Sequence, residues 1–391
     1  MTAPDFKKAI PPLLALTGIF FLNFITRIIL SPFLIFILED FNLTKAQAGE
    51  LFLILSLGFS VALLGSTFVS SRIAHKNVVV LSALGIAFFL CMAALSPSVN
   101  WLRLSLLGAG LAGGLYFPSG FALLTSIVKP QHWGKAIAIH EIAPNLSFVT
   151  APLMAELFIR TGLGWRWMLV FVSIYALAAI FLFKGFCRFG NEKSQRPDTS
   201  GYLKVVSSPS FWTLILFFSL AIGATQGIFA QTPLYLITAH GIDSSFANYL
   251  LSISRLSGII LVFCAGMIVD RIGVKRSLFI FMSLTGLCTM ALGLSSGKIL
   301  VAWVLIQPTV ACCYFPAGFA ALSRAFLPET RPVAISLIVP AAVLAGGGLI
   351  PTILGYFGDQ AMFALGFILM GAVIVLSVSA IPFLVDNNKN Q

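Results

Sequence analysis

The chain is organised around one short stretch between two apolar runs, Gly266-Met-Ile-Val-Asp270-Arg271-Ile-Gly273-Val-Lys275-Arg276. Gly266 is expected to let two helices approach closely, and Gly273 permits a bend with positive φ. Asp270 can accept hydrogen bonds from the N-terminus of a neighbouring helix, while the three basic residues stand where anionic lipid headgroups lie. A positively charged turn with no further role is the plainer interpretation of this stretch alone.

The composition is that of a membrane protein. The 391 residues are 59% hydrophobic and 9% charged, with a mean hydropathy of +1.00, whereas a soluble domain carries about 25% charged residues. The net charge of +11 comes from basic residues scattered over short turns, without a basic stripe and interleaved aromatics. We therefore expect membrane lipid around the chain and no nucleic-acid partner.

The sequence contains none of the patterns that indicate an enzyme. There is no phosphate-binding loop, no nucleophile–base constellation and no paired metal-ligand spacing. The six cysteines lie in or beside apolar runs and are interpreted as small buried residues. We expect no enzymatic activity and no cofactor or metal, and an ATP-driven pump is excluded as far as this chain alone can show.

Twelve apolar runs are long enough to cross a bilayer, which needs about 20 residues. They lie at about 11–37, 47–70, 77–96, 101–128, 134–159, 164–186, 209–237, 245–269, 276–295, 299–326, 332–357 and 360–384. The polar segment 188–208 divides them six to six. The predicted fold is an all-α membrane protein with two pseudo-symmetric six-helix bundles, 1–187 and 209–391, joined by a cytoplasmic linker over 188–208.

Orientation follows from the basic residues. If the spans lie as predicted, seventeen of the 24 Lys and Arg residues fall on one side, four on the other, and three inside spans. Because basic residues favour the cytoplasmic side, both termini are predicted to be cytoplasmic in a multi-pass protein of the cell's inner membrane.

The two halves repeat each other. Tyr116-Phe-Pro-Ser-Gly-Phe-Ala122 returns as Tyr314-Phe-Pro-Ala-Gly-Phe-Ala320, Ser31-Pro32 as Thr232-Pro233, and Arg72 as Arg271. The offsets of 198, 201 and 199 residues are nearly equal, which low-complexity apolar sequence would not maintain. Parallel six-helix repeats of this kind build a central site from both halves.

The glycine- and charge-rich turn resembles the loop between helices 8 and 9 of the major facilitator superfamily of transporters. Gly164-Trp-Arg-Trp-Met168 also resembles a motif of that family at the start of helix 6. The resemblance implies alternating access, and it implies gating roles for Gly266, Asp270, Arg271, Gly273, Lys275, Arg276 and, in the first half, Arg72. The first half departs from the pattern, with Ser71 in place of the acid and Ala74 in place of the second glycine.

Two arginines, one from each half, are predicted near the membrane midplane. Arg27 and Arg255 each lie about ten residues inside a span, which is about 15 Å deep at 1.5 Å per residue. Such a pair can grip a carboxylate or sulfonate, because guanidinium suits bidentate recognition of oxyanions. The alternative is that a helix C-terminus or a carboxylate neutralises each arginine. Arg103, at the start of its span, is interpreted as structural.

Glu141 is the one acid well inside a span, and His140 precedes it. A carboxyl or imidazole group removed from water can titrate near neutral pH, so the two residues are candidates for proton coupling. The competing interpretation is that Glu141 pairs with Arg27 or Arg255 and packs the halves together. Because the spans contain these two arginines and only one acid, the predicted cavity is positively charged, which favours an anionic substrate.

Five further residues are candidates for substrate contact: Asn23, Gln226, Gln231, Tyr116 and Tyr314. The amides could bind substrate or tie helices together, and the tyrosines could pack rather than bind. The first half also resembles organic anion:cation symporters at Asn23-Phe24-x-x-Arg27, although Gly113 stands where an acid is common in that group. Exchange or uniport therefore stays open beside proton symport.

We therefore expect a secondary active transporter for a small organic anion, functional as a monomer. The alternatives are a proton-coupled drug or metabolite exporter that uses Glu141, and a non-transporting sensor or assembly factor on the same fold.

Overall fold

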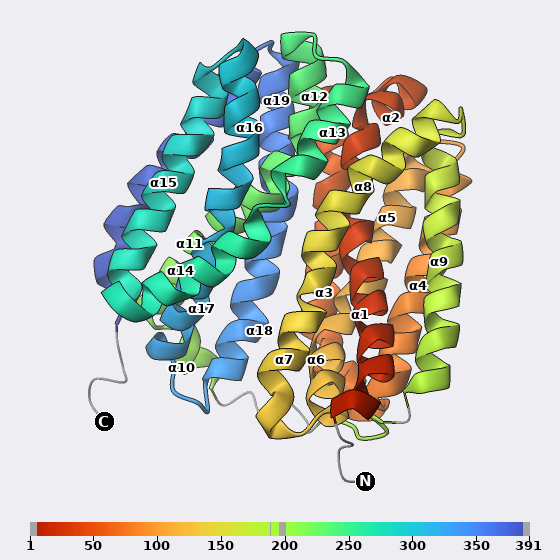
Figure 1. Cartoon of the computed structure of the whole chain (residues 1–391), viewed down its shortest axis with the longest axis vertical. Coiled ribbons are helices and arrows are strands. Elements are labelled where there is room, and N and C mark those ends of the chain that lie inside the picture. The colour runs from red at the N-terminus through yellow and green to blue at the C-terminus, as the bar shows by residue number, and fades with distance from the viewer. Residues whose placement is uncertain (1–5, 188, 195–200, 386–391) are drawn as a thin grey trace. The chain divides into compact units, whose positions relative to one another are not determined.

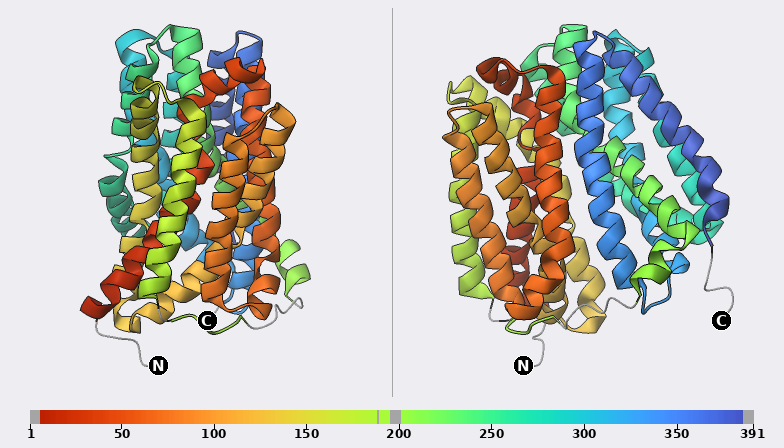
Figure 2. Two further views of the ribbon diagram at one scale, coloured as in Figure 1. Left: turned by 90° about the vertical axis from the view of Figure 1, so that its right-hand side faces the viewer. Right: turned by 180° about the vertical axis from the view of Figure 1, so that it is seen from behind.

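The computed structural model describes residues 6–187, 189–194 and 201–385, and every element of regular secondary structure among these residues is a helix (Figures 1 and 2). Eleven helical stretches among them are long and apolar enough to cross a membrane. The remaining predicted span, 245–269, is present as two consecutive helices. The predicted all-α membrane fold is confirmed.

Contacts divide the chain into two compact units, which are described separately. Unit 1 comprises Met1–Phe33 and Ile54–Pro197, and unit 2 comprises Leu34–Leu53 and Asp198–Gln391. One boundary falls inside the polar segment 188–208. The other differs from the predicted division, because residues 34–53 pack with helices of the second half of the sequence.

Unit 1 is a bundle of the first spans. Its helices are α1 (Phe6–Ile28), η1 (Ser31–Phe33), most of α3 (Lys45–Arg72), α4 (His75–Ala94), α5 (Val99–Gly114), α6 (Tyr116–Ile127), η2 (Pro130–His132), α7 (Trp133–His140), α8 (Ile142–Arg160) and α9 (Gly164–Phe186). Helix α1 packs on α8 and α9, and α4 packs on α5 and α9. The fully buried Leu13, Leu16 and Ile19 mark the inner face of α1.

Unit 2 contains the later spans together with α2 (Leu34–Phe41) and the start of α3. Its other helices are α10 (Tyr202–Val206), α11 (Pro209–Ile222), η3 (Gly223–Gly227), α12 (Ile228–His240), α13 (Ser244–Ser254), α14 (Gly258–Ile272), α15 (Val274–Leu294), α16 (Gly297–Cys312), α17 (Tyr314–Ala325), α18 (Arg331–Ala342), η4 (Val343–Leu349), α19 (Ile350–Asp359), α20 (Phe363–Ser377) and η5 (Val378–Phe383). The segments η3 and η4 are π-helical and pack on each other.

Prolines explain three interruptions inside spans. The breaks lie at Leu115 before Pro118, Glu141 before Pro144, and Cys313 before Pro316, always three residues ahead of the proline. Proline has no N–H, so the carbonyl four residues earlier loses its helical partner. Glu141 thus lies at a helix break rather than in the continuous helix that we predicted over 134–159.

The break between α13 and α14, at residues 255–257, contains no proline. Side chains from α16 stabilise it instead: the Thr309 hydroxyl donates to the Ser254 carbonyl at 3.4 Å and lies 2.6 Å from the Ser257 hydroxyl. A carbonyl released at the end of α13 therefore has a partner on another helix. The predicted continuous span over 245–269 was wrong at this point.

Candidate functional site

In unit 1, Arg27 lies in the last turn of α1 with aromatic rings against its guanidinium group. Its Cζ atom is 5.0 Å from the ring centre of Phe24 and 4.6 Å from that of Phe59, within the range of cation–π contact. The side chain is half-buried. Rings that cover a guanidinium face leave the in-plane N–H groups as its hydrogen-bond donors.

In unit 2, Arg255 lies directly after the last residue of α13 and is 4% exposed. One Nη atom donates to the Thr225 carbonyl of η3 at 2.6 Å. The Cζ atom is 5.0 Å from the Phe229 ring centre. Arg255 also borders a small cavity inside unit 2, together with Phe229, Thr232, Ser254, Gln307 and Pro308.

The two arginines therefore share a setting: each ends a helix inside a span, and each contacts phenylalanine. A helix C-terminus carries about half a negative elementary charge, which balances part but not all of a guanidinium charge. The neutralisation that the sequence left open is thus present in part. Polar side chains also lie near Arg255, because Thr232, Ser254 and Gln307 line the same small cavity.

Two of the predicted amide ligands already bond to the protein. The Asn23 amide donates to the Gly113 carbonyl at 2.7 Å, and the Gln231 amide donates to the Pro351 carbonyl at 2.8 Å. Both side chains are buried, Gln231 completely. These hydrogen bonds favour the interpretation that Asn23 and Gln231 connect helices rather than bind substrate. The third amide, Gln226, lies half-buried in η3.

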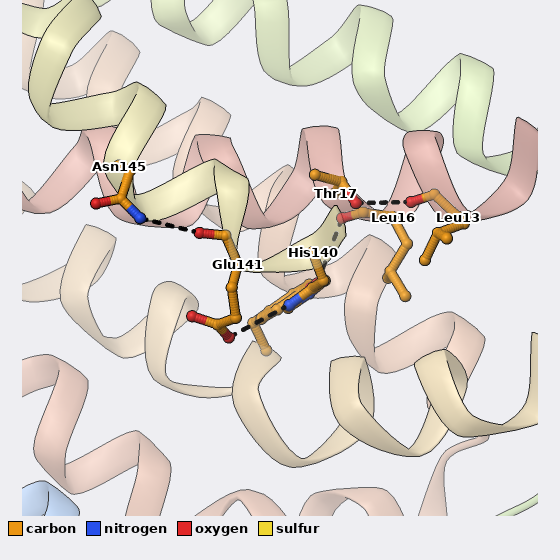
Figure 3. A network of polar contacts seen from close by, with 7 residues as sticks. Leu13, Leu16, Thr17, His140, Glu141 and Asn145 are labelled. Atoms are coloured by element: carbon orange, nitrogen blue, oxygen red, sulfur yellow. Dashed lines mark hydrogen bonds and ion pairs between the residues drawn. The ribbon is translucent and has the colours of Figure 1, made fainter. Parts of the chain in front are cut away.

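A polar chain in unit 1 runs from Tyr116 through His140 to Glu141, and Figure 3 labels its last two members. The Tyr116 hydroxyl lies 2.9 Å from His140 Nε2 and 3.3 Å from the Leu16 carbonyl oxygen. On the other side of the ring, His140 Nδ1 lies 3.8 Å from a carboxylate oxygen of Glu141. Tyr116 and His140 are fully buried, but the Glu141 side chain is half exposed.

This chain has room for one additional proton. When the imidazole is charged, both ring nitrogens donate. Nε2 can then donate to the Tyr116 oxygen while the hydroxyl donates to the Leu16 carbonyl, and Nδ1 faces the carboxylate. In unit 1, the titratable side chain that the described residues place beside the Glu141 carboxylate is His140.

The second half lacks the same chain at the repeated position. Tyr116 packs on Phe20 with ring centres 5.4 Å apart, and Tyr314 packs on Phe218 at 5.3 Å. Both pairs obey the 198-residue offset, but that offset carries His140 to Ile338. The Tyr314 hydroxyl is buried and has no hydrogen-bond partner among the described residues. The histidine is therefore specific to the first half and is not required for packing the tyrosine.

The turn between α14 and α15 agrees in part with the sequence. Gly273 has φ +83°, as predicted. The expected close approach at Gly266 is not observed, because no described atom lies within 4 Å of a Cβ built there. Asp270 and the basic residues Arg271, Lys275 and Arg276 are exposed, as is Arg72 in the equivalent turn of unit 1.

The turn of unit 1 that lacks the acid has another partner, which the sequence did not reveal. The His75 and Lys76 N–H groups at the start of α4 donate to the carbonyls of Glu192 and Gly190, both at 3.0 Å. The Ser70 and Ser194 hydroxyls lie 2.8 Å apart. The described segment 189–194 thus supplies oxygen acceptors for the first N–H groups of α4.

Gln307 and Cys312 also belong to the Arg255 surroundings and were missed. The Gln307 amide donates to the Ala224 carbonyl of η3 at 3.0 Å, and the Cys312 thiol is close enough to Arg255 for the two groups to interact electrostatically. Gln307 occurs in an apolar run, and its polarity was the one signal that could have identified it. Arg103 donates to the Asn100 side chain within its own helix end, as expected of a structural residue.

Comparison with known proteins identifies one family model, the Major Facilitator Superfamily, which matches residues 16–310 and 238–391. The uncharacterised transporter YycB of Bacillus subtilis (strain 168) is 22% identical over 319 residues, covering 77% of this chain and 75% of YycB. The Na(+), Li(+), K(+)/H(+) antiporter of Planococcus maritimus is 32% identical over 145 residues. That alignment covers 35% of this chain and only 33% of the antiporter.

Solved structures share the fold. A bacterial homologue of the human lysosomal transporter Spinster, in an inward-facing and unoccupied conformation, superposes with a TM-score of 0.80 at 17% identity. The match covers 97% of this chain and 98% of the homologue. A D-xylose-proton symporter superposes with a TM-score of 0.77 at 16% identity, covering 99% and 100% of the two chains.

Proposed function

Because the chain belongs to the Major Facilitator Superfamily, we propose that this secondary transporter carries a small organic anion, carboxylate- or sulfonate-like, with a proton as the coupling ion. The family consists of transporters rather than enzymes, and the chain is a multi-pass membrane protein. The proposal includes a place in the cytoplasmic membrane, with both termini in the cytoplasm and one chain as the working unit.

The observation that carries the anion proposal is the pair of guanidinium groups at helix ends inside spans. Each guanidinium group is permanently charged, and each contacts a phenylalanine ring inside its span. An anion that replaces water at such a group gains charge-assisted hydrogen bonds, which are about twice as strong as neutral ones. In this proposal both arginines bind the substrate. Arg255 then donates its hydrogen bond to the substrate instead of to the Thr225 carbonyl.

The proton proposal rests on the chain from Tyr116 through His140 to Glu141. The buried imidazole can receive a proton by way of the half-exposed Glu141 carboxylate, since the two groups are 3.8 Å apart. The absence of a histidine at the repeated position, Ile338, supports a function for His140 beyond packing. Symport and proton-linked exchange both use the same residue.

The gating proposal follows from the family. Asp270 and Arg271 would hold the cytoplasmic side shut in the outward-facing state, and the positive φ of Gly273 shapes their turn. Lys275, Arg276 and Arg72 would contact anionic headgroups at the same membrane surface.

A proton-coupled exporter is the second candidate. Its supporting observation is the half-exposed carboxylate of Glu141, which could receive a cationic substrate. Multidrug resistance protein 3 of Bacillus subtilis (strain 168) is 27% identical over 143 residues, 36% of this chain and 27% of that protein.

The test is a thermal-shift screen of the purified protein against mono- and dicarboxylates, sulfonates, sugars, amines and lipophilic cations, at about pH 5.5 and about pH 7.5. A ligand present at 100 times its dissociation constant stabilises the folded state by about 2.7 kcal/mol. We expect stabilisation by one class of anion, and loss of that stabilisation in Arg27→Gln and Arg255→Gln.

Arg103→Gln is the matched control, because Arg103 bonds to Asn100 at its own helix end. This variant should keep the anion response. Stabilisation by lipophilic cations alone would contradict the anion proposal and favour the exporter, with Glu141→Gln as the next variant.

A further inference from the structure

The N-terminus of α3 is capped by a carboxylate from a residue more than 300 positions away. Asp359, the last residue of α19, accepts hydrogen bonds from the backbone N–H of Lys45 at 2.6 Å and of Ala46 at 3.0 Å. In return, the Lys45 ammonium group donates to the Gly358 carbonyl at 3.0 Å. All four residues belong to unit 2.

Glycines bring the two helices into direct backbone contact next to this cap. A Cβ at Gly355 would collide with the Lys45 carbonyl, and one at Gly49 would collide with the Pro351 carbonyl. Gln231 of α12 donates to the same Pro351 carbonyl. The right-hand view of Figure 2 draws the start of α3 alongside α19.

The charges on both sides of this contact are complementary. A carboxylate at a helix N-terminus is favourable, and so is an ammonium group at a helix C-terminus. Here each helix end receives the charge that it prefers from the other helix. The contact is therefore electrostatic at its edge and close-packed at Gly49 and Gly355.

The contact lies at the opposite end of the unit 2 helices from the Asp270 turn. Helix α3 is continuous, yet contacts assign Lys45–Leu53 to unit 2 and Ile54–Arg72 to unit 1. Three spans separate the Asp270 turn from Asp359, so the two carboxylates lie at opposite ends of the helices of unit 2. Asp359 accepts two backbone hydrogen bonds at one end of unit 2. At the other end, Asp270 forms no hydrogen bond or ion pair within the described chain.

We propose that Asp359 is a gating residue, which keeps the end of the transporter opposite the Asp270 turn closed by holding α3 against α19. Opening that end requires the Lys45–Leu53 part of α3 to leave α19, and thus the loss of both N–H bonds to Asp359. Asp359 and Asp270 then oppose each other in the conformational equilibrium. This inference rests on the alternating access in the proposed function but on no particular substrate.

The test measures distances at both ends by double electron–electron resonance in the full-length protein. One spin-label pair, at Leu163 and Lys298, reports the Asp359 end, and a second pair, at Gln131 and Glu329, reports the Asp270 end; all four side chains are exposed. We expect Asp359→Asn to raise the population with a long Leu163–Lys298 distance about tenfold, and Asp359→Ala to raise it further.

Asp270→Asn should shift both distances the opposite way, and the double variant should return toward the wild type. Asp243→Asn is the matched control, because Asp243 caps only its own helix through Phe246 N at 3.1 Å. Lys45→Met is a second, milder variant that removes the reciprocal bond and should move the population in the same direction as Asp359→Asn.

Distances in Asp359→Ala and Lys45→Met that match the wild type at both ends would overturn the inference, as would a shift in the same direction as Asp270→Asn. The anion proposal is tested separately. A ligand screen in which no anion stabilises the protein would contradict the anion proposal. It would leave the distances measured in the Asp359 variants valid as a test of the gating role.

Discussion

The two repeated tyrosines offer a matched pair of substitutions, Tyr116→Phe and Tyr314→Phe. Both side chains are fully buried and each packs on a phenylalanine. They differ in their hydroxyl groups. The Tyr116 hydroxyl contacts His140 Nε2 and the Leu16 carbonyl, whereas the Tyr314 hydroxyl has no partner in the described part of the chain.

The structure predicts opposite effects on stability. Tyr116→Phe removes a hydrogen bond worth about 1 kcal/mol and leaves a buried His140 nitrogen without a partner, at a further cost of about 1–3 kcal/mol. Tyr314→Phe removes a buried hydroxyl that gains nothing in the folded state, so the change should be neutral or stabilising by up to about 1 kcal/mol. The expected difference between the variants is at least about 2 kcal/mol.

Thermal unfolding of the purified variants measures this difference, and Tyr116→Phe should unfold several degrees below Tyr314→Phe. The same variants also test function, because only Tyr116→Phe alters the surroundings of His140. We expect a changed pH dependence of uptake in Tyr116→Phe and an unchanged one in Tyr314→Phe. Equal melting temperatures and equal pH profiles would refute the assignment of His140 to a functional polar chain.

Three other predictions concern the site and the gate. Arg255→Gln should abolish anion binding while the protein still folds and is expressed, and bound anion should slow alkylation of Cys312 in the wild type. Unaltered affinity in the variant would exclude Arg255 as a ligand. His140→Ile introduces the residue type found at the repeated position, Ile338, and should uncouple uptake from a proton gradient while anion exchange continues. Gradient-driven uptake at the wild-type rate would contradict this prediction. Asp270→Asn should shift the conformational equilibrium toward the inward-facing state by about 1–3 kcal/mol. The measurement is the rate at which cysteines are labelled from the cytoplasmic side. An unchanged labelling rate would contradict the gating role of Asp270.

Features that depend on local chemistry were predictable from the sequence. Span lengths follow from apolar runs, and Gly273 has the positive φ that its place in a tight turn indicates. The break at Glu141 was also implicit, since Pro144 deprives the carbonyl four residues earlier of its partner. The repeat was visible because Tyr, Pro and Arg kept their register.

Features that depend on distant partners were not predictable. The break after Ser254 needs Thr309 on another helix, and the cap on Lys45 needs Asp359, which lies 314 positions away. Hydropathy and spacing contain no information on such pairs. For the same reason the sequence left two interpretations of Glu141 open, proton coupling with His140 and pairing with an arginine; in unit 1 the Glu141 carboxylate lies 3.8 Å from His140.

Uptake into proteoliposomes is the most direct test of the central claim that the chain is a proton-coupled carrier of organic anions. Liposomes containing the wild type, Arg255→Gln or His140→Ile would receive the anion that stabilises the protein best, with and without an inward proton gradient. The account predicts gradient-driven accumulation in the wild type, no uptake in Arg255→Gln, and exchange without accumulation in His140→Ile. Accumulation by Arg255→Gln at the wild-type rate, or efflux of lipophilic cations with no anion flux, would contradict it.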